Sequence, residues 1–113
     1  MPKLAEAVLL RIFVGENDRY QGKPLVPAII SRAIENQLAG ATVLYGRDGF
    51  GVSRTIRTDF NTIDGGPQLP MVIEMVDSEA KINGFLPILN QMIGSGLVTL
   101  EKVQARQYRT SGG

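Results

Sequence analysis

The chain of 113 residues contains no cysteine, no histidine and no tryptophan. Without cysteine there are no disulfides, thiolate metal ligands or thiol nucleophiles, and without histidine the commonest metal ligand and general base is missing. The remaining candidate bases, Asp48, Asp59 and Asp64, fall in one loop with no fixed partner in the sequence. We therefore expect neither a metal site nor enzyme activity.

Long apolar runs and an excess of one charge are also lacking. No apolar run approaches the roughly 18 residues of a membrane span, and Glu6 and Arg11 interrupt any signal-like core at the N-terminus. The net charge of +1 gives no domain-wide basic excess of the kind that accompanies nucleic-acid binding. With 43% apolar and 20% charged residues, the composition predicts one globular, cytoplasmic domain over residues 1–113 that binds no nucleic acid.

Four aliphatic and β-branched runs predict strands at residues 7–14, 41–45, 69–76 and from 97 to about 106. Apolar residues at intervals of three and four predict two helices between them. The first helix is expected to begin at Pro24 and to end at Gly40, and the second is expected to be capped by Asp77 or Ser78. Pro87 lies inside the second helix, where it predicts a kink or a restart near Phe85.

This order of elements, βαββαβ, predicts a ferredoxin-like α+β fold, in which two helices cover one face of a four-stranded antiparallel sheet. The other face of such a sheet would be open and apolar. Because large apolar patches are rare on the surfaces of monomers, we expect identical subunits to cover it.

The connection from Tyr45 to Gln68 is 24 residues long and rich in glycine and arginine. A structureless connection of this length inside a compact domain is usually a binding loop, so we expect function to reside here. A hairpin tip without a role is the alternative. The residues from about 108 to 113 are predicted to form a loose tail.

Several short motifs resemble the nitrogen-regulatory PII proteins in the same order along nearly the whole chain. They are residues 40–45 followed by Gly49-Phe50-Gly51, then Leu69-Pro70 leading into residues 73–76, then Gly94 and Gly96 followed by residues 101–103. Residues 11–16, 22–25 and 96–101 resemble still more closely the PII-like branch long catalogued as a domain of unknown function.

The resemblance implies a homotrimer with three clefts between subunits, each binding an adenine nucleotide. It also implies that the long loop at about residues 46–68, the T-loop, closes over the cleft and docks on a target protein such as a membrane transporter. The nucleotide-binding residues that it implies are Thr42 facing the base, Glu74 and Val76 lining the adenine pocket, Gly49, Phe50 and Gly51 near the phosphates, and Gly94, Ser95 and Gly96 as the phosphate-holding loop.

Lys102 and Arg106 could supply positive charge for the phosphates. Each of these assignments has a structural alternative. Gly94-Ser95-Gly96 could be a helix stop, and Lys102 and Arg106 could be a solvated strand edge. Glu74 is harder to explain structurally, because a carboxylate in an apolar strand needs a partner.

Two departures from the PII pattern limit what carries over. Leu97 stands where the PII phosphate loop has a lysine, so AMP, ADP, ATP and a cyclic nucleotide all remain possible ligands. No tyrosine lies between Gly51 and Leu69, so control by uridylylation is not expected, and the additional residue around Gly46-Arg47-Asp48 suggests a bulge. The alternative function is a structural or adaptor trimer that binds no small molecule.

Overall fold

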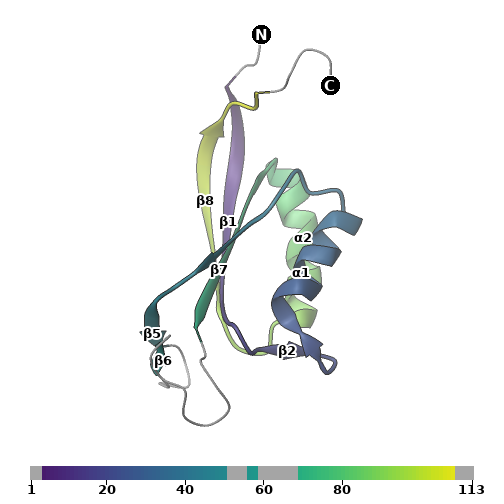
Figure 1. The fold of residues 1–113 in the computed structure, drawn as a ribbon. Coiled ribbons are helices and arrows are strands. Elements are labelled where there is room, and N and C mark those ends of the chain that lie inside the picture. The colour runs from purple at the N-terminus through teal and green to yellow at the C-terminus, as the bar shows by residue number, and fades with distance from the viewer. Residues whose placement is uncertain (1–3, 51–55, 59–68, 109–113) are drawn as a thin grey trace.

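The structure is a computed structural model that describes residues 4–50, 56–58 and 69–108. Its main sheet has four antiparallel strands in the order β4-β7-β1-β8, which are β1 (Ala5–Gly15), β4 (Thr42–Tyr45), β7 (Pro70–Asp77) and β8 (Leu97–Ala105). Helices α1 (Leu25–Glu35) and α2 (Glu79–Met92) lie on one side of this sheet (Figure 1). The predicted ferredoxin-like fold is confirmed.

The hydrophobic core lies between the helices and the sheet. Alternate side chains of β1 point toward the helices, because successive residues of a strand face opposite sides. The fully buried core residues with the largest side chains are Leu10, Ile12, Leu25, Ile29, Ile73, Met75, Ile82, Phe85 and Leu89. Burying each such side chain contributes about 1.5–3 kcal/mol, so this layer is the main source of stability and fixes the register of the sheet.

The opposite side of the sheet, here called the open face, is not covered by any element that the structure describes. Phe13, Leu44, Val76 and Leu97 point to this side and are 37%, 47%, 40% and 59% exposed. The prediction of an open and largely apolar face is therefore confirmed. Figure 1 also shows that β1 and β8 extend together past the helices, at the end of the sheet where Ala5 pairs with Ala105.

The first helix ends earlier than predicted. Instead of continuing to Gly40, α1 stops at Glu35, and Gln37 adopts the left-handed conformation, with φ of 61°. The Gln37 N–H donates to the Ile34 carbonyl at 3.0 Å and the Leu38 N–H to the Ala33 carbonyl at 3.0 Å. These two bonds form a Schellman motif, in which glycine is the usual left-handed residue. The prediction followed the nearest glycine and was wrong by five residues.

The second helix runs without a break through Pro87, so the expected restart near Phe85 does not occur. Pro87 has no N–H for the carbonyl of Asn83, but both residues lie on the exposed side of α2, where water can satisfy that carbonyl. Of the two predicted caps, Ser78 is the N-cap residue, and its Oγ accepts a hydrogen bond from the Lys81 N–H at 3.2 Å.

Two small hairpins were not predicted. Strands β2 (Arg19–Tyr20) and β3 (Lys23–Pro24) pair around Gln21 and Gly22, which both have positive φ, as a two-residue type I′ turn requires. Strands β5 (Asp48–Phe50) and β6 (Ile56–Thr58) pair inside the long connection. The prediction that this connection is structureless is therefore wrong for residues 48–50 and 56–58.

Two backbone hydrogen bonds fix the ends of this long connection. The Gly46 N–H donates to the Pro70 carbonyl at 2.7 Å, and the Glu16 N–H donates to the Leu69 carbonyl at 2.9 Å. The connection thus joins the tips of the neighbouring strands β4 and β7, as predicted. The remainder of the predicted T-loop, at residues 51–55 and 59–68, and the predicted tail at 109–113 lie outside the described residues.

Candidate functional site

Three of the predicted nucleotide-binding residues line one hollow beside the open face. Thr42 and Glu74 are direct partners across β4 and β7, and Val76 lies two residues beyond Glu74 on the same side of β7. The hollow is completed by Leu9 and by the segment 39–41 that leads into β4. It offers a hydroxyl, a carboxylate and apolar walls, which is the combination that orients a flat, polar-edged ligand.

A second hollow adjoins the first and contains Arg106. The two hollows share Ala39 and Val76, and the second also contains Asp77, the last residue of β7, and Ser78, which follows it. Arg106 follows the last residue of β8 and is exposed. The structure therefore places a guanidinium, a group that can bind an anion, in the hollow next to that of Thr42 and Glu74.

Asp77 fixes the position of Ala39, one of the two residues that both hollows share. Its Oδ2 accepts a hydrogen bond from the Ala39 N–H at 2.8 Å, and its Oδ1 accepts one from the Ser78 N–H at 2.7 Å. Close by, the Lys81 Nζ donates to the Gln37 carbonyl at 2.9 Å. The sequence suggested Asp77 only as a helix cap, whereas in the structure it also links Ala39 to the start of α2.

Glu74 has the partner that its position in an apolar strand requires. The Arg11 Nε donates to the Glu74 Oε2 at 2.8 Å, and the Arg11 Nη1 lies 3.7 Å from the Glu101 Oε1. The hydrogen bond to Glu74 raises the pKa of Arg11, so the guanidinium stays charged at any pH used for binding. Arg11 was not predicted as a site residue, although it is the single charge in the apolar run 7–14.

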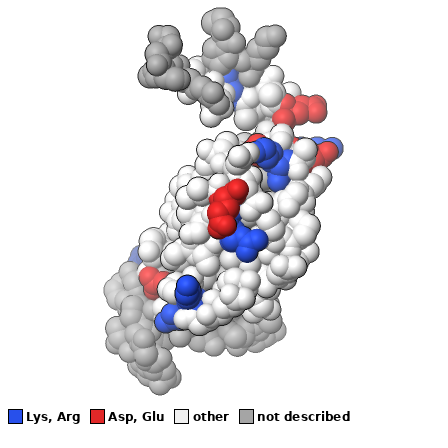
Figure 2. All heavy atoms as spheres, turned by 90° about the vertical axis from the view of Figure 1, so that its right-hand side faces the viewer, with Lys and Arg blue, Asp and Glu red and all other residues white. Residues whose placement is uncertain are grey.

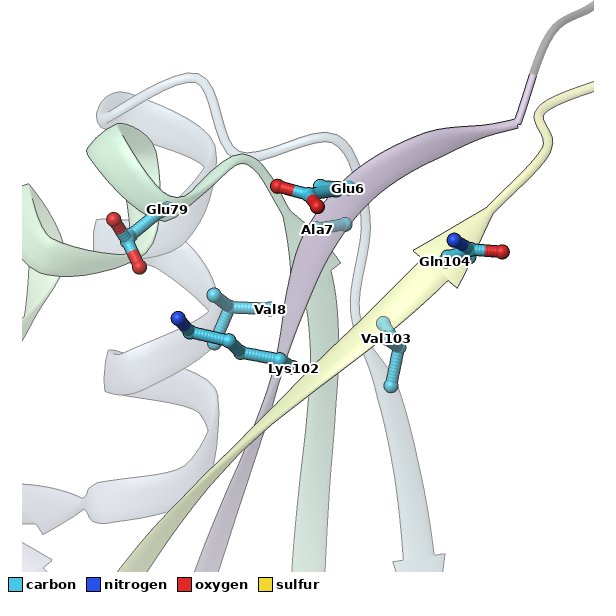
Figure 3. A pocket seen from close by; sticks show the side chains of 7 residues that line it. All are labelled: Glu6, Ala7, Val8, Glu79, Lys102, Val103 and Gln104. Atoms are coloured by element: carbon cyan, nitrogen blue, oxygen red, sulfur yellow. The ribbon is translucent and has the colours of Figure 1, made fainter.

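Lys102 lies on the other side of the sheet. It pairs in register with Val8, a core residue that faces the helices, so its side chain also points to the helix side. Figure 3 shows Lys102 extending toward the first turn of α2, where Glu79 lies, with Glu6 on the same side of the ribbon. Within one chain, Lys102 therefore does not belong to the site formed by Thr42, Glu74 and Val76.

The predicted phosphate loop of Gly94, Ser95 and Gly96 lies at the opposite end of β8 from Arg106. Ten residues of extended chain separate Gly96 from Arg106, which corresponds to roughly 33 Å. Gly96 and Arg106 of one chain are therefore too far apart to contact the same phosphate.

Gly96 also has a structural role. A Cβ atom there would lie 2.7 Å from the Phe13 carbonyl oxygen, whereas one at Gly94 would meet no atom within 4 Å. Gly96 is thus required for close packing on β1, independently of any ligand.

The remaining predicted residues belong to the long connection. Gly49 and Phe50 are part of β5, where they pair with Arg57 and Ile56 of β6. Gly51 lies outside the described residues. Gly46 and Arg47 separate β4 from β5, at the position where the sequence suggested a bulge.

Among the described residues, both signs of charge occur on the surface of the helix side. Lysine and arginine side chains are scattered among aspartate and glutamate side chains, and most of this face carries neither (Figure 2). Over the described ranges, no group of three or more acidic side chains could hold a metal ion. No helix in the described part of the chain is long and apolar enough to cross a membrane.

With this geometry established, comparison with known proteins gives the family. The model of the DUF190 family, described as Uncharacterized ACR, matches residues 7–105. The chain belongs to this family. A UPF0166 protein of Aquifex aeolicus is 36% identical over 90% of this chain and 95% of its own length. A UPF0166 protein of Methanocaldococcus jannaschii is 32% identical over 86% of this chain and 89% of its own.

Solved structures with a similar fold include CPII, a nitrogen regulatory PII-like protein from Thiomonas intermedia K12. Its complex with ADP, AMP and bicarbonate has a TM-score of 0.64 at 16% identity and covers 93% of this chain and 92% of that chain. Its complex with ADP and bicarbonate has a TM-score of 0.60 at 17% identity, with 93% of both chains covered. The DUF190 chain therefore has the PII-like fold, which confirms the resemblance found in the sequence.

Proposed function

We propose that this DUF190 protein is a PII-like signal-transduction protein that binds an adenine nucleotide between the subunits of a homotrimer. The observation that carries the proposal is the hollow formed by Thr42, Glu74 and Val76. It occurs on a fold similar to that of CPII, which was solved with ADP and AMP. The protein would act as a regulator and not as an enzyme.

The side chains of the hollow suit adenine. The Glu74 carboxylate uses Oε2 for Arg11, which leaves Oε1 to accept a hydrogen bond from the exocyclic amino group of the base. A guanine held in the same orientation would present its O6 carbonyl oxygen to the carboxylate in place of that amino group, which is unfavourable. Leu9 and Val76 provide apolar contact for the ring. The hollow would thus select adenine over guanine.

The distances within one chain support a site shared between two subunits. The Gly94 to Gly96 segment and Arg106 lie at opposite ends of β8, so a single chain cannot place both on one nucleotide. A neighbouring copy can bring its own Gly94 to Gly96 segment to the base pocket of the first. This arrangement would allow both groups of predicted residues to act on the same ligand.

Regulation would proceed through the long connection. The β5–β6 hairpin leaves the sheet at the end that is remote from the start of β1 and the end of β8 (Figure 1). A ligand bound at the subunit boundary could bias the position of this loop and so control its docking on a target protein such as a membrane transporter. The target itself would have to be identified by binding experiments with and without nucleotide.

Isothermal titration calorimetry with AMP, ADP, ATP, cyclic AMP, GDP and bicarbonate tests the proposal. The parent protein should bind at least one adenine nucleotide and should bind ADP more tightly than GDP. Glu74→Gln should reduce the preference for ADP over GDP about tenfold, the equivalent of one charge-assisted hydrogen bond. Glu35→Gln, on the exposed side of α1, is the matched control and should bind like the parent. If the parent binds none of these ligands, the adaptor function replaces the proposed one.

A further inference from the structure

A third hollow lies on the helix side of the sheet, across the sheet from the proposed base pocket. Its floor is the ribbon that β1 and β8 form where they extend together past the helices, and its wall is the first turn of α2 (Figure 3). On the floor, Glu6 pairs with Gln104 and Val8 pairs with Lys102, and Glu79 belongs to the wall. The volume of about 370 Å³ is sufficient for a small molecule.

Three charged side chains are directed into this hollow from three different elements. Glu6 of β1, Glu79 of α2 and Lys102 of β8 are exposed, and Figure 3 shows them pointing toward the same space. Glu6 and Lys102 are diagonal neighbours on antiparallel strands, and such positions lie roughly 7–8 Å apart. One small ligand can therefore reach both strands and the helix at once.

The three charged groups are not used by the fold. Within the described part of the chain, none of them forms an ion pair or a side-chain hydrogen bond. No charged residue occurs from residue 82 to residue 100, so the charges of α2 and β8 are grouped toward this end of the molecule. The hollow thus offers both carboxylates and an ammonium group to a ligand.

The balance of these charges restricts the class of ligand. Two carboxylates and one ammonium group give the hollow a net charge of about −1, which disfavours phosphates, bicarbonate and other anions. A simple cation would be repelled by Lys102. A complementary ligand carries two cationic groups and one carboxylate, so that each charge of the hollow meets an opposite charge. A free amino acid with a basic side chain has this combination.

We propose that this hollow binds an α-amino acid with a cationic side chain. Lys102 binds its α-carboxylate, Glu6 and Glu79 bind its two cationic groups, and Val8 contacts its aliphatic part. Copies of the chain packed on the open face would not cover this side of the sheet. Glu6 also lines the hollow that contains Arg106, so the amino acid would lie next to the proposed nucleotide site. The inference goes beyond the proposed function and does not depend on nucleotide binding.

NMR titration of the isotope-labelled parent protein with L-lysine tests the site. We expect saturable shifts of the amide resonances of residues 6–8, 79–81 and 102–104. Norleucine has the same backbone but lacks the side-chain amine, and cadaverine lacks the carboxylate. Each should bind about fivefold more weakly than L-lysine, the equivalent of one exposed ion pair. L-glutamate should bind more weakly than all three, and sodium chloride at matched concentration controls for screening.

Variants identify the groups that bind. Lys102→Met should weaken L-lysine binding about fivefold and remove its preference over cadaverine, whereas Glu6→Gln and Glu79→Gln should each weaken it by a similar factor. Glu35→Gln in α1 and Lys23→Met in β3 make the same changes away from the hollow and should bind like the parent. All five side chains are exposed, so the variants should fold, and their spectra report whether they do.

Three results would overturn the inference. The first is the absence of saturable shifts with L-lysine at millimolar concentration, or shifts confined to other parts of the chain. The second is equal affinity for L-lysine, norleucine and L-glutamate, because the charges of the hollow would then not select the ligand. The third is unchanged L-lysine affinity in the folded Lys102→Met and Glu79→Gln variants.

Discussion

Gly96 has a packing role that does not depend on the proposed phosphate contact. The absence of a side chain lets β8 begin directly against the Phe13 carbonyl oxygen, and this requirement exists without any phosphate. Gly94, two residues earlier, has open space around it and a backbone that any residue can adopt. A substitution at Gly96 therefore tests packing, whereas one at Gly94 can test ligand binding without disturbing the packing.

We expect Gly96→Ala to lower the free energy of unfolding by about 1–3 kcal/mol, because the new Cβ would lie 2.7 Å from the Phe13 carbonyl oxygen. Gly94→Ala should leave stability nearly unchanged, and any loss of ADP affinity in that variant would come from the phosphate contact. Urea denaturation and calorimetry of both variants provide the measurements. Equal stability of the two variants would contradict the packing role of Gly96.

For Glu74, the sequence predicted that a partner is needed but not which residue supplies it. A carboxylate in an apolar strand predicts a partner, but only the register between β1 and β7 places Arg11 directly opposite. Register depends on which faces are buried in the folded sheet, and these two residues are 63 positions apart in the chain. Thr42, Glu74 and Val76 line one hollow because they belong to adjacent strands, whereas Lys102 points to the other side of the sheet.

At the level of elements, the sequence predicted the four main strands to within two residues at each end and both helices of the fold. The predicted end of α1 was wrong, because Gln37 adopts a left-handed conformation that is more common for glycine. The two Schellman hydrogen bonds stabilise this conformation. The β2–β3 and β5–β6 hairpins were not predicted, because each of their strands has only two or three residues. Such short pairs carry no periodic pattern that a sequence could reveal.

Pro87 leads to a prediction about α2. Proline within a helix costs about 3 kcal/mol relative to alanine, partly offset by about 0.4–1 kcal/mol from its restriction of the unfolded chain. Pro87→Ala should therefore raise the free energy of unfolding by about 2 kcal/mol, since alanine supplies an N–H to the Asn83 carbonyl. Pro27→Ala, in the first turn of α1 where proline is well tolerated, should have a much smaller effect. Thermal unfolding of both variants would show whether the two differ.

The segment between α1 and β4 leads to a second prediction at this level. Asp77→Ala removes the acceptor for the Ala39 N–H, so segment 38–42 should exchange its amide hydrogens faster and ADP affinity should fall about tenfold. Lys81→Met removes only the bond to the Gln37 carbonyl and serves as the control. If Asp77→Ala binds ADP as tightly as the parent, the segment does not form the wall of the nucleotide site.

At the level of the whole molecule, the proposed nucleotide site needs further copies of the chain, and such copies would also cover the open face. We predict a particle of three times the 12.3 kDa chain mass in solution at micromolar concentration. Light scattering without added nucleotide measures this directly. A dimer could cover the open face but would contradict the threefold assembly that the PII-like fold led us to expect.

The distance along β8 between the Gly94 to Gly96 segment and Arg106 has a consequence for how such a sensor responds to its own abundance. A binding site built from two chains exists only when the chains are associated, so nucleotide occupancy must obey mass action in protein as well as in ligand. Dilution should weaken the apparent affinity for ADP, and ADP should in turn hold the subunits together at concentrations at which the empty protein dissociates. The protein would then bind nucleotide only when its own concentration is high enough for the subunits to associate.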